Sequence, residues 1–428
     1  MADAAKNNIA GLRIPPGTYF ISSTLPIDID DFQIIAHGAT ISSAMTATKP
    51  LIRVAGDNVS IVGLRTLLTA AVTTTHHYRV TGRSCHIDRC NMEYASAQNT
   101  PAFYVRGGDG FRLTNSRKSG SNEFIGLLEA SDVLIASNQI YGVTGGDDAI
   151  ALKAITRSSE NIRIVDNYVY RHSAIVSFGS QIGMAKADDP RHSRAVRRVH
   201  VEGNVADECA RIAFIKPGAL RSDYRDGLVE NVVFRNNKLR DLKGVTFQRG
   251  FEISAGHGGI VRNVTGEGNT ITARANGDSS TGRKVGALLI EHSGGGANGS
   301  IEDIDIGIAF VDPHDGAPFG SPGTSGHPVQ NIVRIDPKKL NLGKVNLRID
   351  GNGCSESGVL ILPGADSKVT IEKLKITNYN GKNHRLHGGI RTGSAIIESG
   401  DDIVLSGNGR PRVTDAGGSF ATKRPTQN

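Results

Sequence analysis

The chain has 428 residues, a formal net charge of +7, 52 glycines and no tryptophan. This composition argues against an ordinary mixed α/β protein and favours a fold built from repeats. The positive residues are spread along the chain without a Lys/Arg tract or an aromatic RNA-binding signature. We therefore expect an acidic polysaccharide as the partner, and no nucleic acid. No apolar run is long enough to cross a membrane, so we expect no membrane partner.

The four cysteines have neither a metal-binding spacing nor the density of a disulfide framework; they are Cys85, Cys90, Cys209 and Cys354. Cys85 falls at an apolar position beside Ile87, which predicts a buried free thiol. Residues 1–10 lack the charged and apolar regions of a signal peptide.

Short alternating segments open the chain, at residues 11–23, 25–29 and 32–35, and Pro15, Pro16 and Gly17 interrupt them. They predict strands and turns with no helix between them. This opening resembles the first coils of pectate-lyase-like proteins. The resemblance implies an all-β fold, a single-stranded right-handed parallel β-helix, with residues 1–10 as a short N-terminal cap.

From about Leu51 the chain repeats a strand, a turn and a second strand followed by asparagine. These asparagines are spaced by 24, 23, 29, 37, 33 and 32 residues, at Asn91, Asn115, Asn138, Asn167, Asn204, Asn237 and Asn269. One coil thus takes just over twenty residues, and the excess leaves as loops. We expect each asparagine to tolerate left-handed backbone and to bond to the amide one coil away. Apolar residues should stack in the interior, among them Ile87, Leu113, Ile135, Ile164, Val201 and Phe234.

No linker divides the chain, so we predict one β-helix domain over residues 1–428, with a polar C-terminal tail at 406–428. The long segments 184–194 and 217–226 are predicted to wall a groove.

Residues 145–153 read Gly-Gly-Asp-Asp-Ala-Ile-Ala-Leu-Lys. Ile150 and Leu152 face one way in the pattern of a half-buried strand. On a flat strand Asp147 and Asp148 would point to opposite faces, so both reach one substrate only if the backbone turns there, as the glycines permit. The alternative is a loop whose aspartates only cap backbone amides.

Three segments, 145–153, 171–180 and 214–236, follow one another at intervals of about one coil. Together they resemble the family-28 glycoside hydrolases, the polygalacturonases and their relatives. The chain departs from the family at several positions. Glu123 stands near the family's third carboxylate, His172 comes two residues before the family's histidine, and Phe214 replaces its arginine, with Arg211 three residues earlier. Lys216 carries over directly.

The resemblance implies a glycoside hydrolase that cleaves an acidic polysaccharide by paired-carboxylate catalysis. Asp148 would be the general acid, Asp147 and Glu123 would hold the attacking water, and His172 would tune the acid. The implied substrate-binding residues are Lys216, Arg211, Lys153 and Arg171. For His172 the alternative is a turn histidine on the solvent face, and for Lys216 an ordinary solvated lysine. No metal and no cofactor are expected.

Two other functions fit the same fold. A lyase or C5-epimerase would use Lys216 or Arg211 as the base and the acids to hold calcium. A phage-tailspike-like β-helix would bind glycan without cleaving it. Residues 312–315, Asp-Pro-His-Asp, are similar to a motif of alginate C5-epimerases, but their Pro/Gly-rich surroundings favour a loop. Residues 256–259 are predicted to be a glycine turn.

Equivalent points of successive coils lie about 4.8 Å apart. Glu123, Asp147 with Asp148, His172 and Lys216 should therefore form a ladder on one outward face. A polysaccharide substrate favours an extracellular or periplasmic protein, with the export signal absent from this sequence, and a monomer or homotrimer.

Overall fold

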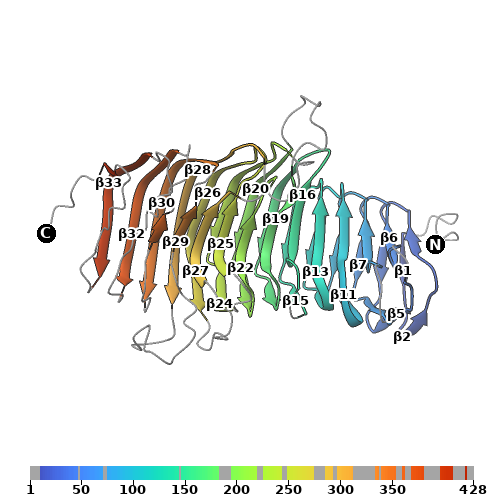
Figure 1. Cartoon of the computed structure of the whole chain (residues 1–428). Coiled ribbons are helices and arrows are strands. Elements are labelled where there is room, and N and C mark those ends of the chain that lie inside the picture. The colour runs from blue at the N-terminus through green and yellow to red at the C-terminus, as the bar shows by residue number, and fades with distance from the viewer. Residues whose placement is uncertain are drawn as a thin grey trace. The chain divides into compact units, whose positions relative to one another are not determined.

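The chain is built from β-strands that stack coil on coil. The computed structural model describes residues 10–46, 49–70, 75–143, 146–182, 194–218, 225–242, 248–273, 285–292, 296–311, 333–336, 339–352, 359–361, 368–379, 396–407 and 420–421. Within these ranges the regular elements are strands, with no α-helix, and strands of neighbouring coils pair in parallel (Figure 1). The fold is the predicted right-handed parallel β-helix. The described part of the chain has no helix that could span a membrane.

Two compact units divide the chain, one of residues 1–177 with 196–206 and the other of residues 178–195 with 207–428. A single domain over 1–428 stays a prediction. The N-terminal cap, the segments 184–193 and 219–224, and the Asp-Pro-His-Asp segment fall outside the described residues.

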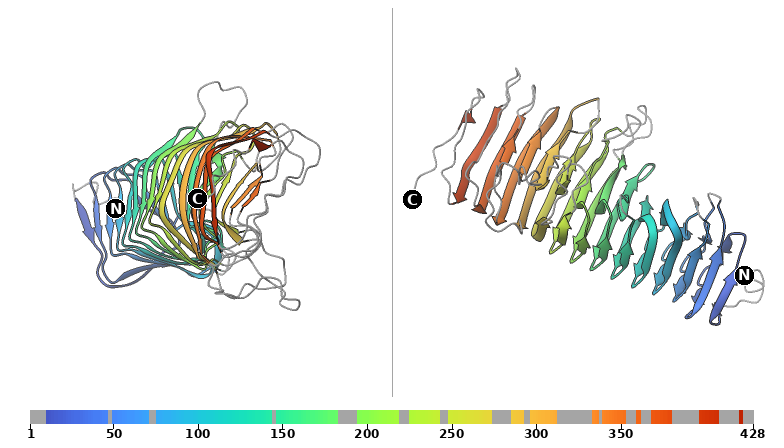
Figure 2. Two further views of the ribbon diagram at one scale, coloured as in Figure 1. Left: turned by 90° about the vertical axis from the view of Figure 1, so that its left-hand side faces the viewer. Right: turned by 60° about the horizontal axis from the view of Figure 1, so that its bottom comes forward.

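In the first unit each coil contributes to three parallel stacks of strands (Figure 2). The first stack contains β1 (Gly11–Arg13), β4 (Gln33–Ile35), β7 (Ser60–Val62), β10 (His86–Asp88), β12 (Arg112–Thr114), β14 (Ser131–Ala136), β17 (Ser159–Val165) and β20 (Ala195–Glu202). The second contains β2 (Gly17–Phe20), β5 (Ala39–Ser43), β8 (Arg65–Leu68), the starts of β11 (Asn91–Arg106) and β13 (Arg117–Leu128), β15 (Gln139–Tyr141) and β18 (Tyr168–Tyr170). The third contains β3 (Leu25–Ile27), β6 (Ile52–Val54), β9 (Tyr78–Val80), the ends of β11 and β13, and β16 (Ile150–Ala154).

The remaining strands are β19 (Ala174–Ile182) and β21 (Val205–Asp207), and then, in the second unit, β22 (Arg211–Ile215), β23 (Leu228–Arg235), β24 (Lys238–Leu242), β25 (Gln248–Ser254), β26 (Ile260–Ala273), β27 (Val285–Glu291), β28 (Gly299–Val311), β29 (Val333–Asp336), β30 (Leu340–Asn352), β31 (Val359–Ile361), β32 (Lys368–Tyr379), β33 (Ile396–Gly407) and β34 (Phe420–Ala421). β33 covers the region in which a last strand was predicted, and the polar tail at 406–428 stays a prediction.

Apolar columns fill the interior of each unit. Along the first stack of the first unit, partners on successive coils are Ile87, Leu113, Ile135, Ile164 and Val201, all buried as predicted. In the second unit Phe234 is buried and packs edge-on against Phe251. Each coil therefore covers the apolar face of the next, which a single coil has no means of burying. Cys85, Cys90 and Cys209 are buried free thiols.

A buried hydrogen-bond ladder follows the end of the first stack. The side-chain oxygen of Asn204 accepts bonds from the backbone N–H and the side-chain amide of Asn167, at 3.0 and 2.9 Å, and Asn167 does the same for Asn138. In the second unit Asn269 accepts from Asn237 in this way. The predicted amide-to-amide bonds are confirmed at these five positions.

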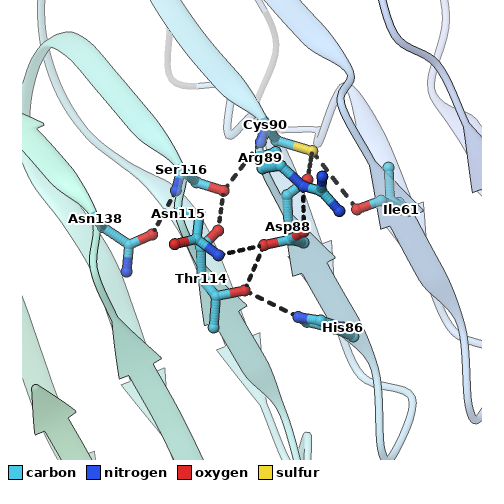
Figure 3. A network of polar contacts seen from close by, with 9 residues as sticks. All are labelled: Ile61, His86, Asp88, Arg89, Cys90, Thr114, Asn115, Ser116 and Asn138. Atoms are coloured by element: carbon cyan, nitrogen blue, oxygen red, sulfur yellow. Dashed lines mark hydrogen bonds and ion pairs between the residues drawn. The ribbon is translucent and has the colours of Figure 1, made fainter.

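The prediction is wrong for Asn91 and Asn115, which lie outside the ladder. Ser116 and Cys90 continue the ladder, since Ser116 N–H donates to Asn138 and Cys90 N–H donates to the Ser116 hydroxyl (Figure 3). Asn115 and Asn91 lie one residue before and one residue after the ladder. Of the seven asparagines only Asn115 has left-handed backbone. The left-handed residue is instead the one before each ladder position, with φ between 50° and 67° at Arg89, Asn115, Ser137, Asp166, Gly203, Asn236 and Gly268.

Asp88 forms hydrogen bonds to residues of its own coil and of the next coil on the outer side of the ladder (Figure 3). Its carboxylate accepts bonds from the Thr114 hydroxyl at 2.7 Å, the Asn115 amide at 2.8 Å and the Arg89 guanidinium at 2.7 Å. Burial opposes ionisation of Asp88, but these bonds outweigh it and lower its pKa to about 2. Asn115 thus stabilises the turn from outside instead of joining the ladder.

Asn167→Ala should destabilise the protein by about 3 kcal/mol, because it removes the oxygen that accepts two bonds from Asn138 and leaves buried donors unsatisfied. Equilibrium denaturation in urea measures the loss. As a control, the exposed Asn298 changed to Ala should alter the free energy of unfolding by less than about 0.5 kcal/mol. Equal effects of the two substitutions would contradict a stabilising ladder.

Candidate functional site

Three carboxylates meet on neighbouring coils of the first unit. Ile125 of β13 pairs with Ile150 of β16, and the N–H of Phe124 donates to the carbonyl of Ala149 at 2.9 Å. This register sets Glu123 beside Asp148, about 4.8 Å away in the backbone. The predicted neighbourhood of Glu123, Asp147 and Asp148 is therefore present.

The two aspartates differ in accessibility. Asp147 is exposed, whereas Asp148 is buried and only 4% exposed. The Asp147 carboxylate accepts a bond from the Asp148 N–H at 2.9 Å, so one aspartate caps the next residue. The expectation that both would stand on one accessible face is wrong for Asp148. The two aspartates precede β16, which starts at Ile150, and there the Oδ1 atom of Asp148 is enclosed while Asp147 faces solvent.

Glu123 occupies an unusual place for a carboxyl group. Its side chain is half-buried, and its Oε1 atom is enclosed with no hydrogen-bond partner among the described residues. Burial raises the pKa of Glu123 to about 7, with smaller contributions from the charges of Asp147 and Asp148 against the opposing charge of Lys153. Glu123 can therefore carry a proton near neutral pH.

The coil before Glu123 adds an aromatic and imidazole wall. Glu123 pairs in register with Pro101, whose carbonyl oxygen lies 2.9 Å from His76 Nδ1. The His76 ring stacks on Tyr104 with centroids 5.5 Å apart. Burial lowers the pKa of His76, and the positive charges of Arg79 and Lys153 lower it further. His76 and Tyr104 were not predicted as site residues.

Behind the carboxylates lies a buried polar group made of Lys118, His77 and His172. Lys118 and His77 are fully buried, and His172 is 3% exposed. His172 was predicted either on the outward ladder or in a solvent-facing turn, and both predictions are wrong. Its Nδ1 lies 2.9 Å from the carbonyl oxygen of Asp147 and its Nε2 lies 3.4 Å from Lys118 Nζ.

Two predicted substrate-binding residues belong to the same unit. Lys153, half-buried on β16, lies close enough to lower the pKa of Glu123 and of His76. Arg171 has left-handed backbone, φ 57°, and its guanidinium lies 4.8 Å from the centre of the Tyr170 ring. Lys153 is therefore in place to act together with Glu123.

Arg211 and Lys216 belong to the second unit. Arg211 Nε lies 2.5 Å from Glu252 Oε2, in an ion pair that is largely buried. Both cations also lie over the Phe214 ring, Lys216 Nζ at 3.8 Å and the Arg211 guanidinium carbon at 4.6 Å from its centre. Arg211 thus already has a carboxylate partner. The ladder from Glu123 to Lys216, and the grip of Arg211 and Lys216 on a sugar, stay predictions.

A search of the described ranges for three or more His, Cys, Asp or Glu side chains able to share a metal ion finds none. Calcium binding in a lyase stays a prediction.

A repeat signal could have revealed Lys118. It stands in register with Met92 on one side and Ile140 on the other, at a position that other coils of the first unit fill with uncharged residues. If the repeats are aligned coil by coil, this lysine stands out among uncharged residues. The alignment, however, requires the register of β13.

No protein-family model and no curated protein matches the chain. Several solved structures resemble the chain. A double mutant of the tailspike protein of E. coli bacteriophage HK620, in complex with a pentasaccharide, has a TM-score of 0.54 at 11% identity, over 89% of this chain and 75% of that one. The Azotobacter vinelandii mannuronan C-5 epimerase AlgE6 A-module has a TM-score of 0.49 at 12% identity, over 89% and 92%. The Yersinia enterocolitica family 28 exopolygalacturonase has 0.48 at 12%, over 82% and 72%. At 11% identity the likeness to the tailspike protein shows the fold alone.

The raised pKa of Glu123 makes stability depend on pH. Between the ordinary glutamate pKa of about 4.5 and the folded value of about 7 the folded state binds more protons than the unfolded state. The contribution of Glu123 to stability is therefore complete below about pH 4.5 and is lost as the pH rises through about 7. The difference in free energy of unfolding between the wild type and Glu123→Gln should fall across this window in urea titrations. A difference independent of pH would contradict the raised pKa.

Proposed function

We propose that this protein is a glycan-acting enzyme, a glycoside hydrolase that cleaves an acidic polysaccharide with Glu123 as its general acid. The observation that carries the proposal is the enclosed Glu123 carboxyl group beside Asp147 and Asp148, with a pKa near 7. Carboxyl groups whose environments differ in this way are suited to the separate roles of acid and base.

In the proposed step the protonated Glu123 donates its proton to the glycosidic oxygen as the bond to the anomeric carbon breaks. The exposed Asp147 carboxylate accepts a proton from water, whose oxygen forms the new bond to that carbon. One water is consumed, and the two carboxyl groups exchange protonation states until solvent resets them. Asp148, named as the acid from sequence, is assigned a supporting role because it is buried.

Charge supports an acidic substrate. Lys153 next to Glu123 and Arg79 near His76 are cations in the neighbourhood of the carboxylates, and the chain has a net charge of +7. A uronate carboxylate would be held by such cations while the acids act on the adjacent linkage. The half-buried rings of Tyr104 and His76 would contact the sugar ring.

A second candidate is a β-helix that binds glycan without cleaving it. The burial of Asp148 favours this function, because one of the two motif acids is withdrawn from a substrate. The solved tailspike protein that resembles this chain in fold holds a pentasaccharide. In this function Asp147 and Glu123 would accept or donate hydrogen bonds to sugar hydroxyls.

Glu123→Gln should reduce the rate of hydrolysis by about 10²–10⁴-fold, because the amide has no acidic proton to donate. Activity of the wild type should fall as the pH rises above about 7, where Glu123 loses its proton. Digestion of a panel of uronate polysaccharides, with mass analysis of the products, measures both. Glu202→Gln, on β20, is the matched control and should retain full activity.

Three outcomes of that digestion would overturn the proposal. Intact polymer together with measurable glycan binding would support the binding function. Unsaturated, ultraviolet-absorbing ends would support a lyase. Full activity of Glu123→Gln with loss of activity in Asp148→Asn would return the acid role to Asp148.

Gly126→Ala offers a milder test. A Cβ at Gly126 would come within 2.9 Å of Glu123 Oε1, which sits at the end of a flexible side chain. The carboxyl group should move, lowering kcat by about tenfold or more while the free energy of unfolding changes little. Gly307→Ala, where a Cβ meets nothing nearer than 3.4 Å, is the control. Unchanged kcat in Gly126→Ala would argue against Glu123 as the acid.

A further inference from the structure

Lys118 is the one charged residue in a buried column of the first unit whose other described members are Ile41, Thr66, Met92, Ile140 and Val169. It stands in one column with Met92 and Ile140, its partners on the neighbouring coils, and the next coil adds Val169. All four side chains are completely buried. Burying an ammonium group among such neighbours is costly, so a lysine that serves only to fill the column is a poor choice.

The Lys118 ammonium is directed toward the polar group behind the carboxylates. Nζ donates to the carbonyl of Ser121 and lies 3.4 Å from His172 Nε2. Burial lowers the pKa of Lys118 to about 7, while the nearby Glu123 opposes the change. Burial lowers the pKa of His77, and the nearby positive charge of Lys118 lowers the pKa of His77 further.

The hydrogen bonds of His172 fix its tautomer. The Asp147 carbonyl oxygen, 2.9 Å from Nδ1, can only accept, so Nδ1 carries the proton. Nε2 is then an acceptor, and it accepts a hydrogen bond from the Lys118 Nζ–H. The same Asp147 carbonyl accepts the N–H of Ser173 at 3.1 Å. The backbone that carries Asp147 is thus held by His172, and His172 by Lys118.

We propose that Lys118 is a positioning residue, which acts through His172 to fix the turn that carries Asp147 and Asp148. The inference rests on the proposed function for its effect on catalysis, but its structural part is independent of it. Lys118 itself touches no substrate. It sets the orientation of the imidazole, and the imidazole sets the place of the Asp147 backbone and hence of the carboxylate that activates water.

Lys118→Met separates this role from a merely structural one. Methionine already fills the same column one coil away, at position 92, so the free energy of unfolding should be equal or higher. The rate constant kcat should nevertheless fall by about 10²-fold with little change in KM, since a displaced group misplaces the water. Met92→Leu, in the same column, is the control and should keep both kcat and stability.

Amide hydrogen exchange measures how firmly the Ser173 N–H is bonded to the Asp147 carbonyl, and it requires no substrate. In Lys118→Met the Ser173 amide should exchange about fivefold faster, because its bond to the Asp147 carbonyl is weakened. Mass spectrometry of the peptide covering residues 170–178 measures this in the full chain. In Met92→Leu the exchange should match that of the wild type.

A double substitution tests whether the effect passes through His172. Lys118→Met should cause no further loss of kcat and no further gain in exchange in a His172→Leu background, because the link is already broken. If His172→Leu fails to fold, His172→Phe, which keeps a ring but has neither a donor nor an acceptor, takes its place. Independent, multiplying effects would overturn the proposal, as would wild-type kcat and wild-type exchange in Lys118→Met. A wild type that cleaves no glycan would refute the proposed function, and the exchange measurement would still decide the role of Lys118.

Discussion

Parallel pairing between coils is the constraint on which the rest of this structure depends. Every strand bonds to the equivalent strand one coil away, so a residue meets its counterpart about 4.8 Å along the axis. Columns follow from this stacking: apolar residues such as Ile135 and Ile164 inside, and the asparagine amides of Asn138, Asn167 and Asn204 at the corner. An amide in such a column is satisfied only if its neighbours have the same register.

The same stacking gathers the candidate site. Glu123 and Asp148 are far apart in sequence but adjacent in register, and the Asp147 turn is held from the following coil by His172 and Ser173. Bringing carboxyl groups together while removing Glu123 from water raises its pKa, because the charged form loses solvation and meets like charges. Stacking of coils thus creates a proton-carrying group from residues of neighbouring coils.

A buried lysine and two buried histidines lie behind the candidate site. Lys118, His77 and His172 replace apolar side chains in a fold whose stability comes from apolar contact between coils. Such groups weaken the core locally unless their hydrogen bonds are satisfied. These three groups lie directly behind the acids, where His172 bonds to the backbone of Asp147.

The sequence by itself determined the fold class, because the spacing of short strands and asparagines reports the coil length, and the apolar alternation reports the face that each coil buries. It also singled out Glu123, Asp147, Asp148 and Lys153 as candidate site residues. Only the tertiary structure decided the register, which moved Asn91 and Asn115 out of the ladder, and the direction of side chains, which buried Asp148 and His172 and left Asp147 exposed. A shift of one residue reverses the face of a strand side chain, and loops of unequal length hide that shift in the sequence. Lys118 was not predicted for the same reason, because its register with Met92 and Ile140 is known only once the coils are stacked.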